Sequence, residues 1–487
     1  MAVRVIIVGA GAAGIYSAYR LRKTLGSTAE IVLLEQSARV GGNAMATPID
    51  GVNLECGAQF FHRGAQSSFM ALLDALELWG TCEMVRTAAG FTIWDRARSL
   101  RVLHLPATLA GFGSLGLGDW VRTTKFGLFI AYCYALERWE TDWTVTVDAW
   151  LGRMRLLDDA FKHEVIKPFL FQFVTLPSHR IGEASAKYAV TYLVRTMFPG
   201  AGVRPDVPRL GHGRPTFEAY QSLLGLHEVH QRVLAAAEVR ATLRTRVLAI
   251  QPRSATGESP GRVTVVTPEG TLTADHVVVA TDPHVVATAL VAGGAAEPAL
   301  ITCLQALEYA RLPISMQHGL PGHMPDRRAD WQPFNTIVDG DALMFSVWFG
   351  PMRRPAADGS LVHAFKSWGS PRLQPSAPPS EFLAHEHFIP LPTASFMRTR
   401  EQLMNCWQGH GGVWFAGGWT RWFDSQEAAL QSADVVALGI ASRVREQAMG
   451  TDLRAPVVEF LDRCSNHAPV ELRGALAHAL DEVEARG

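Results

Sequence analysis

Residues 3–14, VRVIIVGAGAAG, are the stretch that decides the fold. The apolar run in 3–8 predicts a fully buried strand, and residues 12–25, AAGIYSAYRLRKTL, have the apolar spacing of a helix. A second apolar run, IVLLE, ends on Glu35. A strand, a glycine-rich turn, a helix and a second parallel strand form the βαβ unit that binds a dinucleotide.

Each glycine of this turn has its own reason to lack a side chain. Gly9 allows the tight turn, Gly11 lets the backbone approach the pyrophosphate, and Gly14 lets the helix pack closely on the strand. The helix N-terminus then faces the phosphates, and a ribose hydroxyl donates a hydrogen bond to Glu35. The residues expected to contact the dinucleotide here are Gly9, Gly11, Ala13, Gly14, Glu35 and Gln36. An ordinary βαβ unit with incidental glycines is the alternative.

Two motifs further along the chain distinguish a flavin nucleotide from a nicotinamide nucleotide. An arginine and paired glycines occur in residues 32–43, VLLEQSARVGGN, and residues 54–62 read LECGAQFFH. Together they resemble the start of the flavin-containing amine oxidase and phytoene desaturase superfamily. The resemblance implies non-covalent FAD, with the arginine and paired glycines along the diphosphate and the later Gly-Ala pair beside the flavin ring. The residues implied are Arg39, Gly41, Gly42, Gly57, Ala58 and Gln59.

The same superfamily has a C-terminal signature, which this chain carries in residues 412–420, GVWFAGGWT, and residues 425–432, SQEAALQS. We expect a strand, a loop and a helix here, so that the chain returns to its first domain and the helix N-terminus stabilises negative charge on the reduced flavin. The signature departs from the superfamily where Gly418 replaces the usual aspartate and Ala428 replaces a glycine. The cofactor-binding residues that the resemblance implies in the later segments are Val247, whose backbone would meet the adenine, and Gly417, Gly418, Gln426, Glu427 and Ala428.

These motifs predict an α/β fold. A Rossmann-type FAD-binding domain of the discontinuous, GR2-like kind is joined to a mixed α+β substrate domain with a helical cap. The expected segments are residues 1–85, 215–290 and 395–446 for the FAD-binding domain, residues 86–214 and 291–394 for the substrate-binding domain, and residues 447–487 for a C-terminal helical tail. Residues 86–214 are expected to be mainly helical.

The composition is that of a cytoplasmic enzyme. The chain has 487 residues, of which 48% are hydrophobic and 19% charged, and a formal net charge of −1. A near-neutral charge gives no reason to expect nucleic acid or an anionic membrane surface as a partner. The longest other apolar run, residues 126–136, is too short to cross a bilayer, and no histidines or cysteines have the spacing of metal ligands. We therefore expect no integral membrane segment and no metal, while the oligomeric state stays open.

The residues that follow the implied flavin-side Gly-Ala pair are the candidates for chemistry. Gln59, His62 and Arg63 are the first three polar side chains there. His62 is either a general base, because histidine titrates near about 6.5, or a structural histidine bonded to the backbone. Arg63 either binds a substrate carboxylate in bidentate fashion or forms a structural ion pair. Trp419 is expected in the wall of the substrate pocket, with simple packing as the alternative.

An apolar substrate suits the predicted cap, which is rich in aromatic residues. Each ring taken alone is more typical of a core than of a ligand pocket. The rings concerned are Trp120, Phe126, Phe129, Tyr132, Tyr134, Trp139, Trp143, Phe169, Phe171 and Phe173. Residues 318, 324–335 and 414–417 also resemble a bacterial branch of predicted NAD/FAD-binding oxidoreductases, which is associated with unsaturated lipids and other hydrophobic metabolites.

Two features of amine oxidases are missing from the sequence. No lysine occurs between Lys187 and Lys366, where the resemblance implies a lysine that holds a water at the flavin, and Ser425 rather than an aromatic residue comes shortly before Glu427. We therefore predict dehydrogenation or desaturation of a hydrophobic metabolite by hydride transfer to flavin N5, with oxygen or another acceptor reoxidising the flavin. The alternatives are a redox-neutral isomerase or cyclase, an amine or amino-acid oxidase, and a flavin-binding protein that is not an enzyme.

Overall fold

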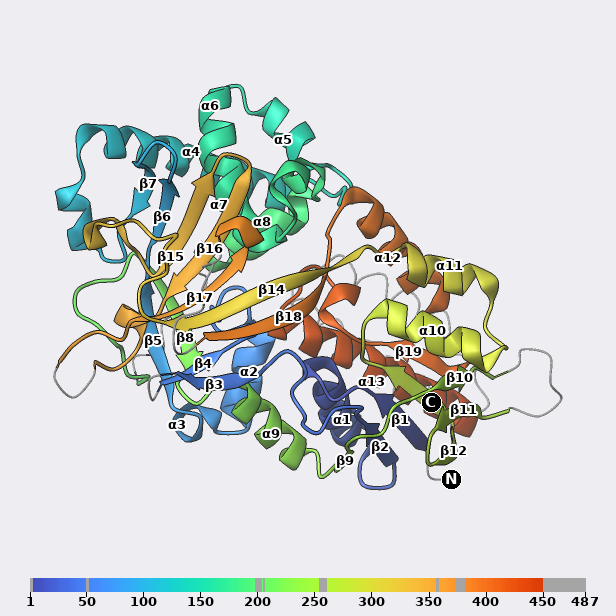
Figure 1. Cartoon of the computed structure of the whole chain (residues 1–487). Coiled ribbons are helices and arrows are strands. Elements are labelled where there is room, and N and C mark those ends of the chain that lie inside the picture. The colour runs from blue at the N-terminus through green and yellow to red at the C-terminus, as the bar shows by residue number, and fades with distance from the viewer. Residues whose placement is uncertain are drawn as a thin grey trace.

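A parallel sheet forms the first layer of the molecule, at the lower right of Figure 1. The computed structural model describes residues 3–49, 52–197, 204, 206–253, 261–355, 359–373 and 382–449. The sheet has the strand order β19-β13-β1-β2-β9, and every neighbouring pair is parallel. Its strands are β1 (Arg4–Val8), β2 (Glu30–Leu34), β9 (Ala241–Thr242), β13 (His276–Val279) and β19 (Val413–Phe415). Three distant parts of the chain thus build one Rossmann-type sheet, and the predicted α/β class is confirmed.

Helices α1 (Ala12–Leu25), α9 (Leu226–Ala236) and α13 (Gln426–Met449) pack beside this sheet. The apolar spacing of α1 buries Ile15 and Leu21 completely. The Tyr16 hydroxyl on α1 donates a hydrogen bond of 2.7 Å to Gln426 Oε1 at the start of α13. This contact joins residues 410 positions apart and fixes the C-terminal helix next to the first one.

A small antiparallel sheet lies beside the parallel sheet and consists of β10 (Ala249–Gln251), β11 (Val263–Thr267) and β12 (Gly270–Ala274). Helix α10 (Pro283–Gly293) follows β13 and packs against β10. Asp282 begins α10, because its carboxylate accepts hydrogen bonds from the amides of His284 and Val285. This end of the molecule faces away from the second layer in Figure 1.

A seven-stranded sheet forms the second layer, with the order β18-β14-β17-β16-β15-β6-β7. All its pairs are antiparallel except β15 with β6. Its strands are β6 (Phe91–Asp95), β7 (Leu100–Leu105), β14 (Tyr309–His318), β15 (Phe334–Asp339), β16 (Ala342–Trp348), β17 (Ala364–Gly369) and β18 (Phe382–Pro390). Strands β6 and β7 lie within residues 86–214, which were expected to be mainly helical; β6 pairs with β15, and β7 pairs with β6 at the edge of the sheet.

Helices cover one side of the second sheet, at the top of Figure 1. They are α4 (Leu117–Trp139), α5 (Val147–Arg153), α6 (Asp159–Phe161), α7 (Lys167–Val174) and α8 (Ala186–Met197). Helix α11 (Pro298–Ala306) packs against α10 and against α12 (Ala394–Trp407), at the right of Figure 1. The remaining elements, near the junction of the layers, are α2 (Ser67–Ala75), α3 (Leu78–Thr81) and the strand pairs β3 (Ala46–Ile49) with β4 (Val52–Glu55) and β5 (Met84–Ala89) with β8 (Phe217–Ser222).

Helix α13 continues to Met449, three residues into the segment predicted as a tail. The rest of that predicted helical tail, residues 450–487, lies outside the described residues. Among the residues that are described, no helix is both long enough and apolar enough to cross a membrane.

Candidate active site

The turn after β1 leaves no room for side chains. A Cβ on Gly14 would lie 1.9 Å from the carbonyl oxygen of Gly9, and a Cβ on Gly42 would lie 3.0 Å from the Cα of Gly11. Gly9 also has a φ of +98°. Helix α1 begins at Gly11 without a side-chain cap, so its first amides face the space above the turn. The turn after β1 and the loop of Gly41 and Gly42 therefore form a backbone cradle without side chains, as the predicted pyrophosphate site requires.

Glu35 is held in a fixed orientation at the end of β2. Its Oε2 accepts a hydrogen bond of 2.8 Å from the Ala10 amide, and its Oε1 accepts bonds from the amide and hydroxyl of Ser37. The side chain lines a cavity of about 210 Å³ together with Gly9, Gln36 and Val247. The structure thus brings four of the predicted cofactor residues together at the carboxyl ends of β1 and β2, where α/β sheets bind nucleotides.

Arg39 organises the second glycine loop. Its guanidinium donates hydrogen bonds to the carbonyl oxygens of Gly42, at 2.8 Å, and of Ala44, at 3.1 Å. The Gly41 amide donates to the Ala10 carbonyl at 2.7 Å, which ties this loop to the first one. The arginine therefore shapes the backbone that would surround the diphosphate.

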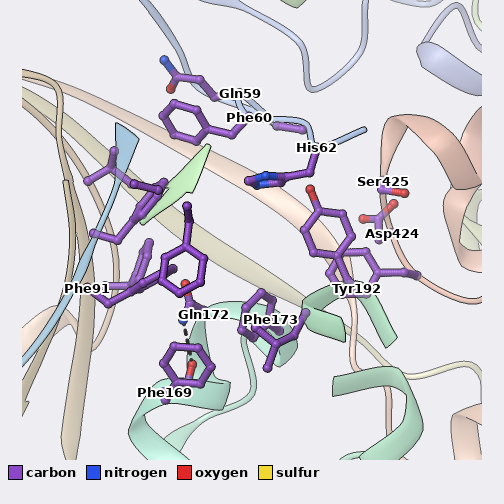
Figure 2. Close-up of a pocket in the computed structure, with 18 of the residues that line it drawn as sticks. Gln59, Phe60, His62, Phe91, Phe169, Gln172, Phe173, Tyr192, Asp424 and Ser425 are labelled. Atoms are coloured by element: carbon purple, nitrogen blue, oxygen red, sulfur yellow. Dashed lines mark hydrogen bonds between the residues drawn. The ribbon is translucent and has the colours of Figure 1, made fainter. Parts of the chain in front are cut away.

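A second cavity, of about 230 Å³, lies between the two layers. Its polar end is lined by residues of the flavin-side motifs, including Gly57, Ala58, Gln59, Ser425 and Gln426. Its other walls are aromatic and come from the seven-stranded sheet and from α4, α7 and α8 (Figure 2). The rings are those of Phe60, Phe91, Phe126, Phe169, Phe173, Tyr192, Phe217, Phe334, Phe345, Trp368 and Phe423.

The aromatic residues of the predicted cap lie partly in the cavity wall and partly at the surface. Phe126, Phe169 and Phe173 line the aromatic cavity. Trp120 and Trp139, by contrast, are exposed on the outer side of α4. The helical spacing was therefore a correct guide to which residues share a helix, but one face of α4 points outward. The sequence did not identify the rings of the sheet, because strands β15 to β17 are buried on both faces, so burial does not distinguish the face that lines the cavity.

His62 lies in the aromatic cavity and is neutral. Its Nδ1 is 3.0 Å from the carbonyl oxygen of Glu218 and donates to it, which leaves Nε2 as the acceptor. Burial lowers the pKa of His62 to about 4. Gln59 is buried beside it, and neither amide atom of its side chain has a hydrogen-bond partner among the described residues. An unpaired buried amide that lines a cavity is the kind of group that a ligand satisfies.

Two other candidates lie elsewhere. Arg63 is not one of the residues that line the aromatic cavity. Trp419 is buried in the core, where its ring packs against Phe415 with a centroid distance of 6.4 Å, and it does not line the cavity either. The place of Trp419 in the wall of a substrate pocket stays a prediction.

Lys366 is the functional residue that the sequence reasoning missed. It is buried on β17, lines the aromatic cavity and donates a hydrogen bond from Nζ to the carbonyl oxygen of Gly57. Burial lowers its pKa to about 8, and burial raises the pKa of nearby Glu55 to about 7. The sequence comparison counted the lysine of amine oxidases as missing, whereas Lys366, which ends the lysine-free stretch, lies beside the flavin-side motif at Gly57. A charged residue inside the otherwise apolar strand AFKSWG was the available signal.

The start of α13 supplies a carboxylate to the cavity. A Cβ on Gly418 would lie 2.3 Å from Asp424 Oδ1, so the carboxyl of Asp424 occupies the space where a side chain at position 418 would begin. Asp424 lines the cavity, and desolvation raises its pKa to about 6. Glu427 instead accepts hydrogen bonds from the amides of Ser68 and Phe69, so it stabilises the start of α2. Glu427 and Ala428 line neither cavity.

Comparisons with known proteins agree with this geometry. Residues 7–76 match the family of NAD(P)-binding Rossmann-like domains. No curated protein sequence matches the chain. A putative protoporphyrinogen oxidase from Exiguobacterium has a similar structure, with a TM-score of 0.60, 15% identity and coverage of 91% of this chain and 99% of that one. Cyclohexylamine oxidase from Brevibacterium oxydans has a TM-score of 0.60 and 16% identity, with coverage of 91% of this chain and 100% of that one. A CLA-producing fatty acid isomerase from P. acnes has a TM-score of 0.58 and 13% identity, with coverage of 90% of this chain and 98% of that one. The chain therefore has the fold of these solved structures, with a Rossmann-like nucleotide-binding unit at residues 7–76, as its motifs predicted.

Proposed function

We propose that this chain is an FAD-dependent oxidoreductase that removes two electrons from an apolar small molecule. The observation that carries the proposal is a backbone contact between two regions: a Cβ on Gly57, which lines the aromatic cavity, would lie 2.4 Å from the carbonyl oxygen of Asn43, next to the paired glycines. The glycine cradle and the cavity of Glu35 and Val247 suit a dinucleotide, and the aromatic cavity begins at Gly57 and Ala58. The unpaired amide of buried Gln59 fits a polar ring edge at that junction.

The division of labour between segments follows from this arrangement. In our proposal residues 1–85, 215–290 and 395–446 bind the cofactor, and residues 86–214 and 291–394 bind the substrate. No cysteine lines either cavity among the described residues, and His62 is already bonded to the Glu218 carbonyl. Both observations support non-covalent binding of FAD.

The chain's own residues have three tasks in the reaction. Bound FAD would supply the acceptor for the hydride that leaves the substrate carbon. The aromatic walls hold the substrate against the junction and exclude water. Lys366 in its neutral form takes the proton that the substrate loses, so that two electrons and two hydrogens leave the substrate in total. Oxygen or another acceptor then reoxidises the cofactor.

Two alternative functions each have a supporting observation. The structural similarity to a fatty acid isomerase favours a redox-neutral isomerase or cyclase. Lys366 and the cavity-lining carboxylate of Asp424 favour an amine oxidase more than the sequence did, because a carboxylate attracts an ammonium group.

The test is the visible spectrum of the purified protein, followed without oxygen while fatty acids, polyenes, amines and amino acids are added in turn. Bleaching of the flavin band near ~450 nm by an apolar substrate supports the proposal. Bleaching by amines alone favours the amine oxidase, and product of unchanged mass with an oxidised flavin favours the isomerase. A protein that takes up no FAD would contradict the proposal as a whole.

A further inference from the structure

One corner of the second layer exposes large apolar side chains. The corner patch consists of Leu109, Phe112, Leu117, Trp120 and Val121, at the start of α4 and in the 3-10 turn before it. Leu117 is 83% exposed, Val121 51% and Trp120 46%. The rings of Phe112 and Trp120 contact each other at a centroid distance of 6.0 Å. A contiguous apolar surface of this kind marks an interaction site.

The outer face of α4 continues the corner patch. The described structure includes all of α4, and Arg138 is the charged residue among its exposed positions. The others are Leu117, Gly118, Trp120, Val121, Thr124, Gly127, Ala131, Tyr134 and Trp139. The segment that leads into the helix, residues 105–118, contains no charged residue at all. An ordinary surface helix carries charged residues on its solvent face, so water is not the expected neighbour of this face.

Arginines border the corner patch. The carbonyl oxygen of exposed Arg214 accepts a hydrogen bond from the Leu109 amide, at 2.9 Å, which places this residue beside the patch. Arg327 and Arg328 lie on the other side, because Arg101 bridges Asp330 to Asp119 at the start of α4.

The charge balance of this rim is positive. Arg327 is exposed, and so is Arg328, whose guanidinium lies over the Trp348 ring. Asp326 is the exposed acid beside them, whereas Asp119 and Asp330 are ion-paired. The rim therefore suits an anionic surface.

The patch and the aromatic cavity share their chain segments. Leu105, which lines the cavity, ends β7 and leads directly into the corner. Phe126 lines the cavity from the inner face of α4, and Phe217 lines it at the end of the loop that carries Arg214. The corner is therefore the outside of the wall whose inside is the cavity.

We propose that this corner docks onto a lipid bilayer that contains anionic lipids, with the corner patch inserted at the interface and the arginines against the headgroups. Leucine and tryptophan side chains that project from a helix end, with a cationic rim, are typical of interfacial binding. Docking here would bring the aromatic cavity next to the phase in which an apolar molecule dissolves. The net charge of −1 gave no sign of this partner, because it averages over the whole chain.

A second copy of the chain is the competing occupant. In a symmetric dimer through this corner, Arg214, Arg327 and Arg328 of both copies would be brought to one interface, and like charges at a rim oppose association. The same arginines are favourable beside anionic headgroups. The charge pattern therefore favours the membrane.

The test is co-sedimentation of the intact protein with phosphatidylcholine vesicles, with and without phosphatidylglycerol. We expect the protein to bind the anionic vesicles and to be released by high salt, because salt screens the arginines. The double variant L117D/W120D is expected to bind at least ~10-fold more weakly. The matched control is Val291→Asp, since Val291 is 57% exposed on α10, in the other layer of the molecule. Thermal melting checks that both variants fold.

Several outcomes would overturn the proposal. These are a wild-type protein that does not bind vesicles, a double variant that binds as well as the wild type, and equal loss in the control. A dimer in sedimentation that the double variant converts to monomer would assign the corner to a second copy. The readout does not depend on activity or on FAD, so this inference and the proposed function fail separately.

Discussion

Lys366 on β17 donates a hydrogen bond to the carbonyl oxygen of Gly57, although the two residues are 309 positions apart in the chain. This bond ties the seven-stranded sheet to the loop that follows β4. Glu55, two residues before Gly57, is buried and exerts a favourable Coulombic effect on the charged form of Lys366. Burial lowers the pKa of Lys366 and raises the pKa of Glu55, and the Coulombic attraction between the two side chains opposes both shifts.

Replacement of Lys366 tests its role as proton acceptor. Because its pKa is about 8, the neutral amine predominates only above that pH, and the rate of flavin bleaching by substrate should rise with pH to a plateau above about 8. Lys366→Met is expected to lose this pH-dependent limb and to react about 10²- to 10⁴-fold more slowly, with FAD still bound. Stopped-flow absorbance without oxygen measures both the rate of flavin bleaching and its dependence on pH. Glu55 and Cys56 act electrostatically on the amine, the amine acts on His385 and His387, and Arg39 acts on Glu55 and both histidines, so the profile reports their combined field.

Lys187 provides the matched control. It is a half-buried lysine on α8 that bonds the Glu140 carbonyl oxygen and does not line the cavity. Lys187→Met should keep the wild-type profile. An unchanged profile in Lys366→Met would show that the proton goes elsewhere.

The sequence predicted the nucleotide half of the site far better than the substrate half. The signal at Gly9, Gly14 and Glu35 is local in the sequence, because the predicted roles of these residues depend on a strand, a turn and a helix that adjoin one another in the chain. Lys366 and Asp424 act through contacts with Gly57 and Gly418 that depend on how sheets and helices pack. No short-range spacing encodes such contacts, so the residues that meet the substrate could not be deduced.

The space around Gly14 predicts the effect of a single methyl group. In Gly14→Ala the new Cβ would be 1.9 Å from the Gly9 carbonyl oxygen, so α1 must move away from the turn. We expect destabilisation of about 1–3 kcal/mol and reduced FAD content. Gly118→Ala is the control, because nothing lies within 4 Å of a Cβ at this helical position. The absorbance ratio of flavin to protein measures the FAD content, and the urea midpoint measures the stability. Equal FAD content and equal stability in Gly14→Ala and Gly118→Ala would contradict the role of the glycine cradle in FAD binding.

The contact between Gly418 and Asp424 predicts a coupled effect on the flavin. Above pH about 6 the Asp424 carboxylate places a negative charge in the cavity, which disfavours reduction. Asp424→Asn should therefore raise the reduction potential at pH 8 by ~30 mV, equivalent to about 1.4 kcal/mol for two electrons.

A methyl group at position 418 tests whether the contact is direct. Gly418→Ala should displace the same carboxylate, so the double variant should show little more change than Asp424→Asn. Asp206→Asn, on the surface, is the control. Additive shifts in the double variant would show that the two residues act independently.

Buried histidines predict loss of stability in acid. Burial lowers the pKa values of His230, His276 and His323 to about 4, so the folded state binds fewer protons than the unfolded state between about pH 6.5 and pH 4. Their stabilisation is complete above pH 6.5 and is lost as pH falls, by about 2 kcal/mol per histidine at pH 5. In His276→Gln an amide oxygen can still accept from Trp414 Nε1, which donates to His276 Nδ1 at 3.2 Å, and nothing titrates. Urea unfolding at pH 5 and above pH 6.5 should therefore show a smaller loss of stability in acid for His276→Gln than for the wild type. Exposed His212→Gln should behave as the wild type. If all three proteins lose the same stability in acid, other groups cause the loss.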